Sequence, residues 1–313
     1  MVAKGGAKPP ARPMREKLYD AAWGLGVRSW SIAKRLGVLG PLEPILLKLA
    51  PFLIPPPAEE VEIALPWGAN MLVPPGSSRA RNYSTGLYER DVTALFQDTV
   101  KEGMTVVDLG AYIGYYTLLA SRLVGASGRV YAFEPDCKNY SYLVRNTSAN
   151  DCRNVLAESR AVANRTGSAT FIAEPDGEKS HLSGVPEKTA SMVVQTVTLD
   201  DFFAEEGWPS VDLVKMDIEG SERAALEGMR ELSRRNPGMR LIMEFNCMSM
   251  RRADASRDEL VALLMELDFR RGYIIERDLK PFSLPEGFPD GQAVYNLLLA
   301  RKVRAGSGDT CEG

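Results

Sequence analysis

Five short apolar segments alternate with helical segments along the middle of the chain, and this alternation restricts the fold more than any other feature. The apolar segments are residues 105–109, 129–133, 155–163, 212–217 and 240–245. Helical patterns follow them near residues 113–124, 138–149, 219–233 and 256–267. Short apolar strands that alternate with helices are typical of a parallel sheet covered on both faces. The sequence therefore predicts an α/β fold.

The segments on either side extend this prediction. Residues 269–277 and 292–300 have the composition of strands with no helix between them, which indicates an antiparallel strand closing one edge of the sheet. Upstream, residues 61–65 and 70–74 are predicted to form a hairpin, and residues 87–100 a helix. At the start of the last helix, Ser256 and Glu259 have the spacing of a capping box.

Residues 1–60 differ in composition from the rest of the chain, with nine of the 20 prolines and nine basic residues against five acidic ones. We predict helices over residues 14–36 and 44–49 in this N-terminal arm, a main domain over 61–302 and a disordered tail over 303–313. Two interpretations of the arm compete: its helices pack on the main domain or a partner chain, or residues 14–53 lie on a membrane surface. The first is favoured because amphipathic helices usually face a protein core.

Composition excludes several classes of protein. The net charge is −3, from 38 basic and 41 acidic residues, so global electrostatics do not favour nucleic-acid binding. No run of about 18 apolar residues is present, and no apolar stretch follows the basic N-terminus as in a secretory signal. The four cysteines are scattered, which suits free thiols in a reducing compartment. We therefore expect a cytoplasmic protein, which on the second interpretation of the arm also contacts the cytoplasmic face of a membrane.

Residues 106–117, VVDLGAYIGYYT, combine a buried strand, a glycine-containing loop and the start of a helix. Gly110 allows the backbone to approach a ligand, because glycine has no Cβ. A dinucleotide fingerprint needs Gly-x-Gly-x-x-Gly, but Asp108 occupies the first glycine position and the interval from Gly110 to Gly114 is one residue longer. The Asp108 carboxylate would oppose a pyrophosphate but suits a ligand with an ammonium or sulfonium group.

A second acidic residue identifies the rest of this ligand. Glu134 ends the next strand, 20 residues after Gly114, where a carboxylate can accept both hydroxyls of a ribose. A ribose with a cationic tail that carries no phosphate describes S-adenosylmethionine. The alternative is a generic doubly wound domain with a capped helix, which is disfavoured because Asp108, Gly110, Gly114 and Glu134 occur together in this order.

Further motifs follow these two along the chain: VTLDDFF (197–203), VKMDIEGSE (214–222) and LIMEFN (241–246). With VVDLGAYIGYYT and FEP (133–135), the set resembles the FkbM-type S-adenosylmethionine-dependent methyltransferases, over roughly residues 86–246. The resemblance implies the class I methyltransferase fold, a Rossmann-like, mostly parallel seven-stranded sheet with one antiparallel edge strand and helices on both faces. It also implies methyl transfer to oxygen, commonly on a sugar or a polyketide-like natural product.

The resemblance also implies roles for particular residues. The cofactor-binding residues that it implies are Glu89, Asp108, Gly110, Ala111, Tyr112, Gly114, Glu134, Pro135, Arg160 and Asp217. Glu89 would reach the amino group of the cofactor, Glu134 its ribose and Arg160 its adenine. Asp217 and Glu219 lie at the carboxyl end of the fourth strand, where ligands of open α/β sheets bind. Lys215 lies on the same side of that strand, and we expect its partner to be a carboxylate in the site.

Catalysis depends on the acceptor group, because a hydroxyl must lose its proton and a carboxylate needs no base. The candidate bases are His181, Asp217, Glu219 and Glu244, and Lys215 joins them as a candidate catalytic residue. His181 is the only histidine, and we predict it in a polar loop. The non-catalytic interpretation of His181 is a solvated surface position. The non-catalytic interpretation of Asp217 is the N-cap of the following helix. Asp217, Glu244 and Asn246 could hold a divalent cation, but such oxygen sets are common, so no metal is predicted.

These observations favour an S-adenosylmethionine-dependent methyltransferase that acts on a small-molecule, glycan or glycolipid acceptor and not on nucleic acid. The alternative is a lipid or glycolipid methyltransferase that uses the N-terminal arm as a membrane-surface anchor. A binding module without turnover and an NAD-dependent oxidoreductase are disfavoured by the complete residue set and the loop spacing. The sequence leaves homo-oligomer formation open.

Overall fold

The computed structural model describes residues 56–172, 181–183, 191–252, 256–276, 278–289 and 293–301. They belong to two compact units, one ending at Tyr88 and the other beginning at Glu89. The predicted helices and membrane anchor of the arm, and the predicted tail, lie outside the described residues. Across the part of the chain that is described, no helix is long and apolar enough to cross a membrane.

The first unit contains the predicted hairpin, which is confirmed. Strand β1 (Val61–Ala64) pairs antiparallel with β2 (Asn70–Val73), and the short helix α3 (Ala80–Thr85) follows. The helix predicted over residues 87–100 begins later, as α4 (Arg90–Thr99) in the second unit. The reason is local: Gly86 and Glu89 have left-handed backbone conformations, with φ of 70° and 38°, which a helix cannot include.

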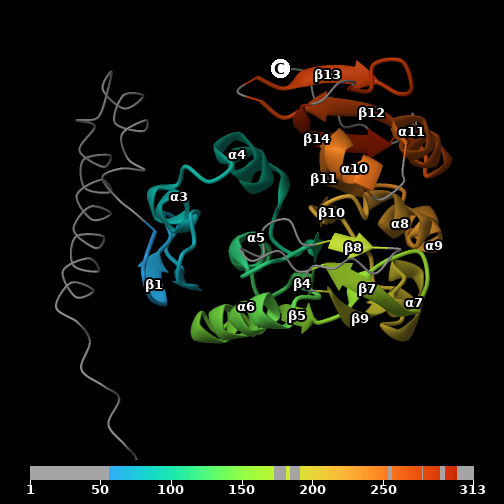
Figure 1. Ribbon diagram of the computed structural model, residues 1–313. Coiled ribbons are helices and arrows are strands. Elements are labelled where there is room, and N and C mark those ends of the chain that lie inside the picture. The colour runs from blue at the N-terminus through green and yellow to red at the C-terminus, as the bar shows by residue number, and fades with distance from the viewer. Residues whose placement is uncertain are drawn as a thin grey trace, which may run out of the picture. The chain divides into compact units, whose positions relative to one another are not determined.

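The second unit is built on an eight-stranded sheet in the order β13-β12-β14-β11-β10-β3-β4-β5 (Figure 1). Its parallel strands are β11 (Arg240–Asn246), β10 (Leu213–Met216), β3 (Thr105–Leu109), β4 (Arg129–Phe133) and β5 (Val155–Glu158). Strand β14 (Val294–Arg301) runs antiparallel to β11 and to β12 (Phe269–Ile274), and β13 (Lys280–Ser283) runs antiparallel to β12. The predicted mostly parallel α/β fold is confirmed.

Two details of the predicted sheet are wrong. The sheet has eight strands instead of seven, because the chain after β12 folds back as β13. The antiparallel last strand β14 also lies between β11 and β12, not at the edge. Leu297, Leu298 and Leu299 are consecutive and all buried, so β14 is covered on both faces. Such an unbroken apolar run is typical of an internal strand.

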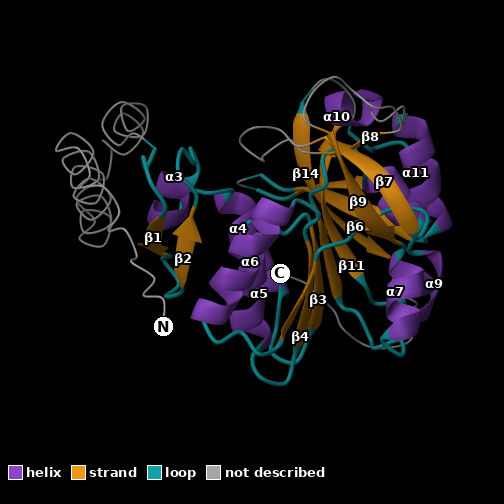
Figure 2. Cartoon of the chain, turned by 60° about the horizontal axis from the view of Figure 1, so that its bottom comes forward, coloured by secondary structure: helices purple, strands orange, loops and turns teal. Residues whose placement is uncertain are grey.

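Helices cover both faces of the sheet (Figure 2). Helices α4, α5 (Tyr115–Val124) and α6 (Cys137–Ala149) lie on one face, and α7 (Leu199–Glu205), α9 (Arg230–Arg235) and α11 (Arg257–Glu266) on the other. Two further helices are α8 (Glu222–Glu227) and α10 (Cys247–Arg252). The single helix predicted over residues 219–233 is therefore two helices. They separate at Gly228, where a Cβ would lie 2.2 Å from the carbonyl oxygen of Ala163.

A smaller sheet has the strand order β6-β9-β7-β8. Its strands are β6 (Ala161–Val162), β7 (Gly167–Ile172), β8 (His181–Ser183) and β9 (Ser191–Val197). The stretch predicted as one strand over residues 155–163 thus divides between the two sheets. The predicted loop position of His181 is also wrong: its backbone belongs to β8 and pairs with that of Ile172. Cross-strand pairing with β7 makes this segment a strand despite its polar sequence.

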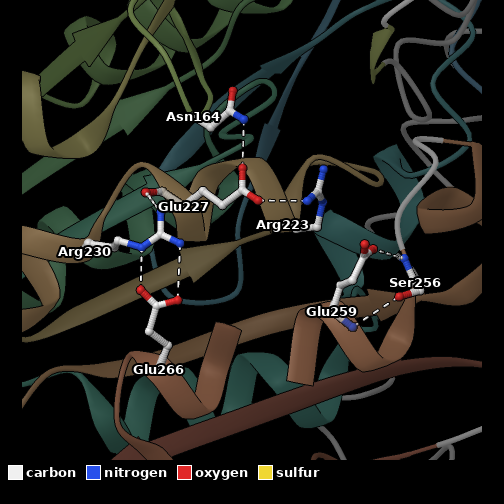
Figure 3. A network of polar contacts seen from close by, with 7 residues as sticks. All are labelled: Asn164, Arg223, Glu227, Arg230, Ser256, Glu259 and Glu266. Carbon is white, nitrogen blue, oxygen red and sulfur yellow. Dashed lines mark hydrogen bonds and ion pairs between the residues drawn. The ribbon is translucent and has the colours of Figure 1, made fainter. Parts of the chain in front are cut away.

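The predicted capping box at the start of α11 is confirmed (Figure 3). The Ser256 hydroxyl accepts a hydrogen bond from the Glu259 backbone N–H at 3.2 Å, and the Glu259 carboxylate accepts one from the Ser256 N–H at 3.0 Å. Two N–H groups that the helix cannot satisfy are paired in this way, so α11 begins at a defined residue.

Candidate active site

The loop between β3 and α5 packs directly against the end of β10. Gly110 has a φ of +78°, and a Cβ built there would lie 1.9 Å from the backbone carbonyl oxygen of Asp217. The predicted reason for this glycine was approach to a ligand, whereas the structure shows an approach to the neighbouring main chain. Gly114, with a φ of +101°, precedes the first residue of α5. A side chain at Gly110 would push the loop away from β10.

Glu134 is buried just after β4 and holds this loop. Its carboxylate accepts hydrogen bonds from the backbone N–H of Tyr112 at 2.8 Å and of Asp136 at 3.0 Å. Tyr112 is in the left-handed conformation, with a φ of 51°. Burial raises the pKa of Glu134 to about 7, although the two backbone hydrogen bonds oppose the shift. A carboxylate has about four lone-pair sites, so further donors could still bind here.

Asp108 lies one residue before the end of β3, with 1% of its surface exposed. The Thr117 hydroxyl donates to its Oδ2 at 2.6 Å, while Oδ1 is buried and has no hydrogen-bond partner among the described residues. Burial raises the pKa of Asp108, and the Lys215 cation and the Thr117 hydroxyl lower it. An unpaired buried carboxylate oxygen is costly, so this atom fits a ligand that donates a hydrogen bond or carries positive charge.

Lys215 is the buried cation of the site. It pairs with Asp108 in the sheet register, and its Nζ lies 3.3 Å from Asp217 Oδ2 and 4.4 Å from the centroid of the Tyr116 ring. Burial lowers the pKa of Lys215, but the carboxylates of Asp217, Glu89 and Asp108 raise it by more, so the net shift is upward. The expected carboxylate partner of this lysine is present, and Lys215 stays charged.

Sequence reasoning missed Tyr116, in the first turn of α5. Its buried hydroxyl donates to Glu89 Oε2 at 2.8 Å and lies 3.3 Å from the Thr93 hydroxyl. Burial and then the Glu89 carboxylate raise the pKa of Tyr116 well above its ordinary value, so the phenol keeps its proton. Its position two residues after Gly114, on the turn that faces the end of β3, was the sequence feature that could have identified Tyr116 as a site residue. Tyr116 thus joins Glu89, at the N-cap of α4, to Lys215.

Three carboxyl groups gather at the ends of β10 and β11. Carboxylate oxygens of Asp217, Glu219 and Glu244 lie within 4.8 Å of one another. Burial raises the pKa of Glu244 to about 8, helped by the charges of Asp217, Glu219 and Glu89 and opposed by Lys215. The N-cap of α8 is Ser221, so the alternative reading of Asp217 as that cap is wrong. Carboxylates at this spacing can share a proton or face a cationic group.

The remaining predicted residues lie in different surroundings. Arg160 follows β5, forms an ion pair with Glu158 at 2.8 Å and lies 5.5 Å from the centroid of the Phe202 ring. Pro135 joins Glu134 to Asp136, and Ala111 donates its N–H to the Phe133 carbonyl at 3.0 Å. His181 lies in the smaller sheet, and its side chain is outside the described part of the chain. The acidic candidates and Lys215 therefore lie close together in the structure, whereas Arg160 pairs with Glu158.

The fold and the site together define a class of protein. A mostly parallel sheet with its last strand reversed, a glycine loop after the first strand of that sheet, and a carboxylate after the next strand are the features of a class I methyltransferase. The model of the methyltransferase FkbM domain matches residues 108–275, which is more than half of the chain. The chain therefore belongs to the FkbM methyltransferase family, and its cofactor is S-adenosylmethionine.

Similar proteins were found by sequence and by structure. The chain is 26% identical over 141 residues to the hexuronic acid methyltransferase AglP of Haloferax volcanii, a match that covers 45% of this chain and 56% of that protein. An O-methyltransferase of Thermotoga maritima is 14% identical, with 80% of this chain and 96% of that chain covered and a TM-score of 0.41. A methyltransferase of Aquifex aeolicus is 18% identical, with 67% and 87% covered and a TM-score of 0.35. At these TM-scores, neither structure bears on the activity of this chain.

Proposed function

We propose that this chain is an S-adenosylmethionine-dependent O-methyltransferase that acts on a hydroxyl or carboxylate of a sugar, a glycan or a polyketide-like natural product. Membership in the FkbM family supports the reaction, and the match to a hexuronic acid methyltransferase supports a sugar-containing acceptor. The observation that carries the proposal is the buried Oδ1 of Asp108 beside the glycine loop, an oxygen that has no hydrogen-bond partner among the residues that the structure describes. It suits the ammonium group of this cofactor, and Glu134 at the next strand suits a ribose.

In this assignment different acidic residues bind different groups of the cofactor. The Glu134 carboxylate accepts hydrogen bonds from the Tyr112 and Asp136 N–H groups, and its remaining lone-pair sites would accept the ribose hydroxyls. Asp108 and Glu89 face the amino group. Lys215 offsets part of their negative charge, and the positive charge of the cofactor would offset more. The buried lysine thus lies among several carboxylates and favours the charged form of Asp108.

The chemistry needs little from the protein beyond alignment. When bound, S-adenosylmethionine supplies a methyl group already activated on a sulfonium. The chain's own residues hold the acceptor oxygen in line with that methyl group and keep water out. The carboxyl end of β10 lies next to the glycine loop, since Gly110 packs against Asp217, and this supports an acceptor position at the ends of β10 and its neighbour β11.

Calorimetric titration of the full chain with S-adenosylmethionine tests the cofactor site. Glu134→Ala removes the ribose acceptor and the partner of two backbone N–H groups, so we expect the dissociation constant to rise at least about tenfold. Glu134→Gln keeps one acceptor oxygen and should lose less. Glu227→Ala, at a partly buried carboxylate of α8 that pairs with Arg223, is the control and should bind as the wild type does. Unchanged affinity in Glu134→Ala would show that the cofactor site is wrongly assigned.

A further inference from the structure

Glu244 lies at the carboxyl end of β11, beyond the part of that strand that pairs with β10. It is in the part of β11 that extends beyond the last paired residue of β10, Met216, and its strand partner on β14 is the neutral Asn296. In the shared register, Lys215 neighbours Ile242, and side chains two residues apart on a strand point to the same face. Glu244 and Asp217 therefore extend the face that carries Lys215 and Asp108.

The other two carboxylates of the group are already engaged. Asp217 is paired with Lys215 at 3.3 Å, and Glu219 accepts a hydrogen bond from the Ser249 hydroxyl at 2.9 Å. Glu244 is half-buried and makes no hydrogen bond within the part of the chain that the structure describes. Of the three carboxylates, Glu244 is thus the one with neither oxygen in a hydrogen bond or ion pair to the described residues.

A separate observation, a buried carboxylate oxygen of Asp108, indicates a ligand on this face. The Oδ1 atom of Asp108 is buried and lacks a partner among the described residues, although Asp108 neighbours Lys215 in the sheet. Charge interactions with Asp217 and Glu89 place Asp108 in the same electrostatic cluster. The side chain of Lys215 is only 5% exposed, so this cation is not available to an incoming anion.

We propose that Glu244 is the catalytic residue that accepts the proton of the acceptor, and that the methylated group is therefore a hydroxyl and not a carboxylate. This inference rests on the proposed function. An acceptor carboxylate would have to approach three carboxyl groups whose neighbouring lysine is already paired. A neutral hydroxyl approaches at no such cost and donates a hydrogen bond to the free oxygen of Glu244.

The step balances without a further reagent. The acceptor oxygen forms a bond to the methyl carbon while the methyl carbon–sulfur bond breaks, and that electron pair remains on sulfur. The hydroxyl proton passes to the Glu244 carboxylate, so one positive and one negative charge disappear together. Burial and the facing charges of Asp217, Glu219 and Glu89 raise the pKa of Glu244 to about 8 against the effect of Lys215. A base with a pKa near the working pH transfers protons most effectively.

The test compares Glu244→Gln with the full-length wild type, using methyl-labelled S-adenosylmethionine and fractionated extract of the host as the acceptor source. Glu244→Asp is the conservative variant, and Glu266→Gln makes the same chemical change on the exposed face of α11. Cofactor affinity is measured by calorimetry for each variant. We expect Glu244→Gln to bind the cofactor within about threefold of the wild type and to lose about 10²–10⁴-fold in labelling rate. Glu244→Asp should keep part of the rate, and Glu266→Gln all of it.

Two further readouts separate a base from a structural residue. The labelling rate of the wild type should rise with pH up to about 8 and then level off, and this rise should vanish in Glu244→Gln. The labelled product should survive mild alkali, as an ether does. Label released as methanol would identify an ester and overturn the inference while leaving the proposed methyltransferase intact.

Other results would also decide against Glu244. A labelling rate in Glu244→Gln equal to that of the wild type would exclude it as the base. Loss of activity with a chelator and recovery with Mg²⁺ would assign the three carboxylates to a cation instead. If the wild type bound the cofactor but labelled nothing in the extract, the proposed function itself would fail.

Discussion

A buried and a surface charged network, both among the described residues, differ in how their charges are arranged. At the strand ends, Lys215 is buried among Asp108, Asp217 and Glu89. On the helical surface, Arg230 and Glu266 join α9 to α11, while Arg223 pairs with Glu227 within α8 (Figure 3). The surface network is solvated and balanced in charge. The buried cluster has more acids than bases.

The difference separates a network with little effect on stability from one that lowers stability unless a ligand supplies positive charge. Exposed ion pairs are screened by water and contribute little, so their exact partners matter little to folding. A buried cluster with surplus negative charge lowers stability, and it persists in a fold when a ligand supplies the missing charge. The orphaned oxygen of Asp108 belongs to the second kind of network.

Removing the buried cation should have the largest effect. Lys215→Met leaves Asp108 and Asp217 without their lysine, so we expect the free energy of unfolding to fall by about 3–5 kcal/mol. Urea denaturation followed by circular dichroism measures this. Lys280→Met removes the exposed lysine that pairs with Glu276 and should leave the urea midpoint unchanged. Equal losses in the two variants would abolish the distinction between the networks.

A buried and a partly exposed glutamate outside these two networks, Glu222 and Glu231, should also respond to pH in opposite directions. Burial raises the pKa of Glu222 to about 7, so the folded state keeps a proton that the unfolded chain loses near pH 4.5. Stability from this group is therefore present at low pH and is lost as the pH rises to about 7. On the surface, Arg234 lowers the pKa of Glu231 to about 2, so its contribution is lost only on acidification.

Glu222→Gln isolates the buried contribution. The amide oxygen can still accept the hydrogen bond from the Gly220 N–H, and the side chain no longer ionises. Compared with the wild type, we expect similar stability at pH 5 and a gain of up to about 3 kcal/mol at pH 8. Urea titrations at several pH values provide the measurement. A variant curve parallel to that of the wild type would mean that Glu222 titrates normally in the folded chain.

The smallest effect should come from the surface pair of Arg230 and Glu266. A double-mutant cycle with Arg230→Gln and Glu266→Gln should give a coupling of less than about 1 kcal/mol, which decreases further in added salt. Thermal or urea unfolding of the four proteins is sufficient. A coupling as large as the loss in Lys215→Met would place the surface network among the determinants of the fold.

Most of the main sheet could be predicted from sequence because its strands are continuous apolar runs. The strands at residues 105–109 and 129–133 have the predicted bounds. The position of β14 could not be predicted, since the order of strands depends on which hairpin inserts between which neighbours. The break at Gly228 was also missed, because the need for a glycine there depends on the close approach of the distant Ala163 carbonyl.

In the site, the residue types were predictable and their partners were not. The sequence placed Lys215 near a carboxylate, and Asp217 is that partner. Tyr116 was missed because nothing in its own segment shows that Glu89, 27 residues earlier, would accept its hydroxyl. Tertiary pairing between elements decides such contacts, and single-sequence patterns do not record it.

The contact between Gly110 and the carbonyl of Asp217 has a consequence for the proposed reaction. On the proposed assignment, the loop that binds the methyl donor and the strand end that binds the acceptor are in direct main-chain contact. The separation of the two ligands is then set by the packing of main chain on main chain and not by side-chain rotamers. On this assignment the distance that the methyl group must travel is fixed by the fold itself, and neither ligand has to create it on binding.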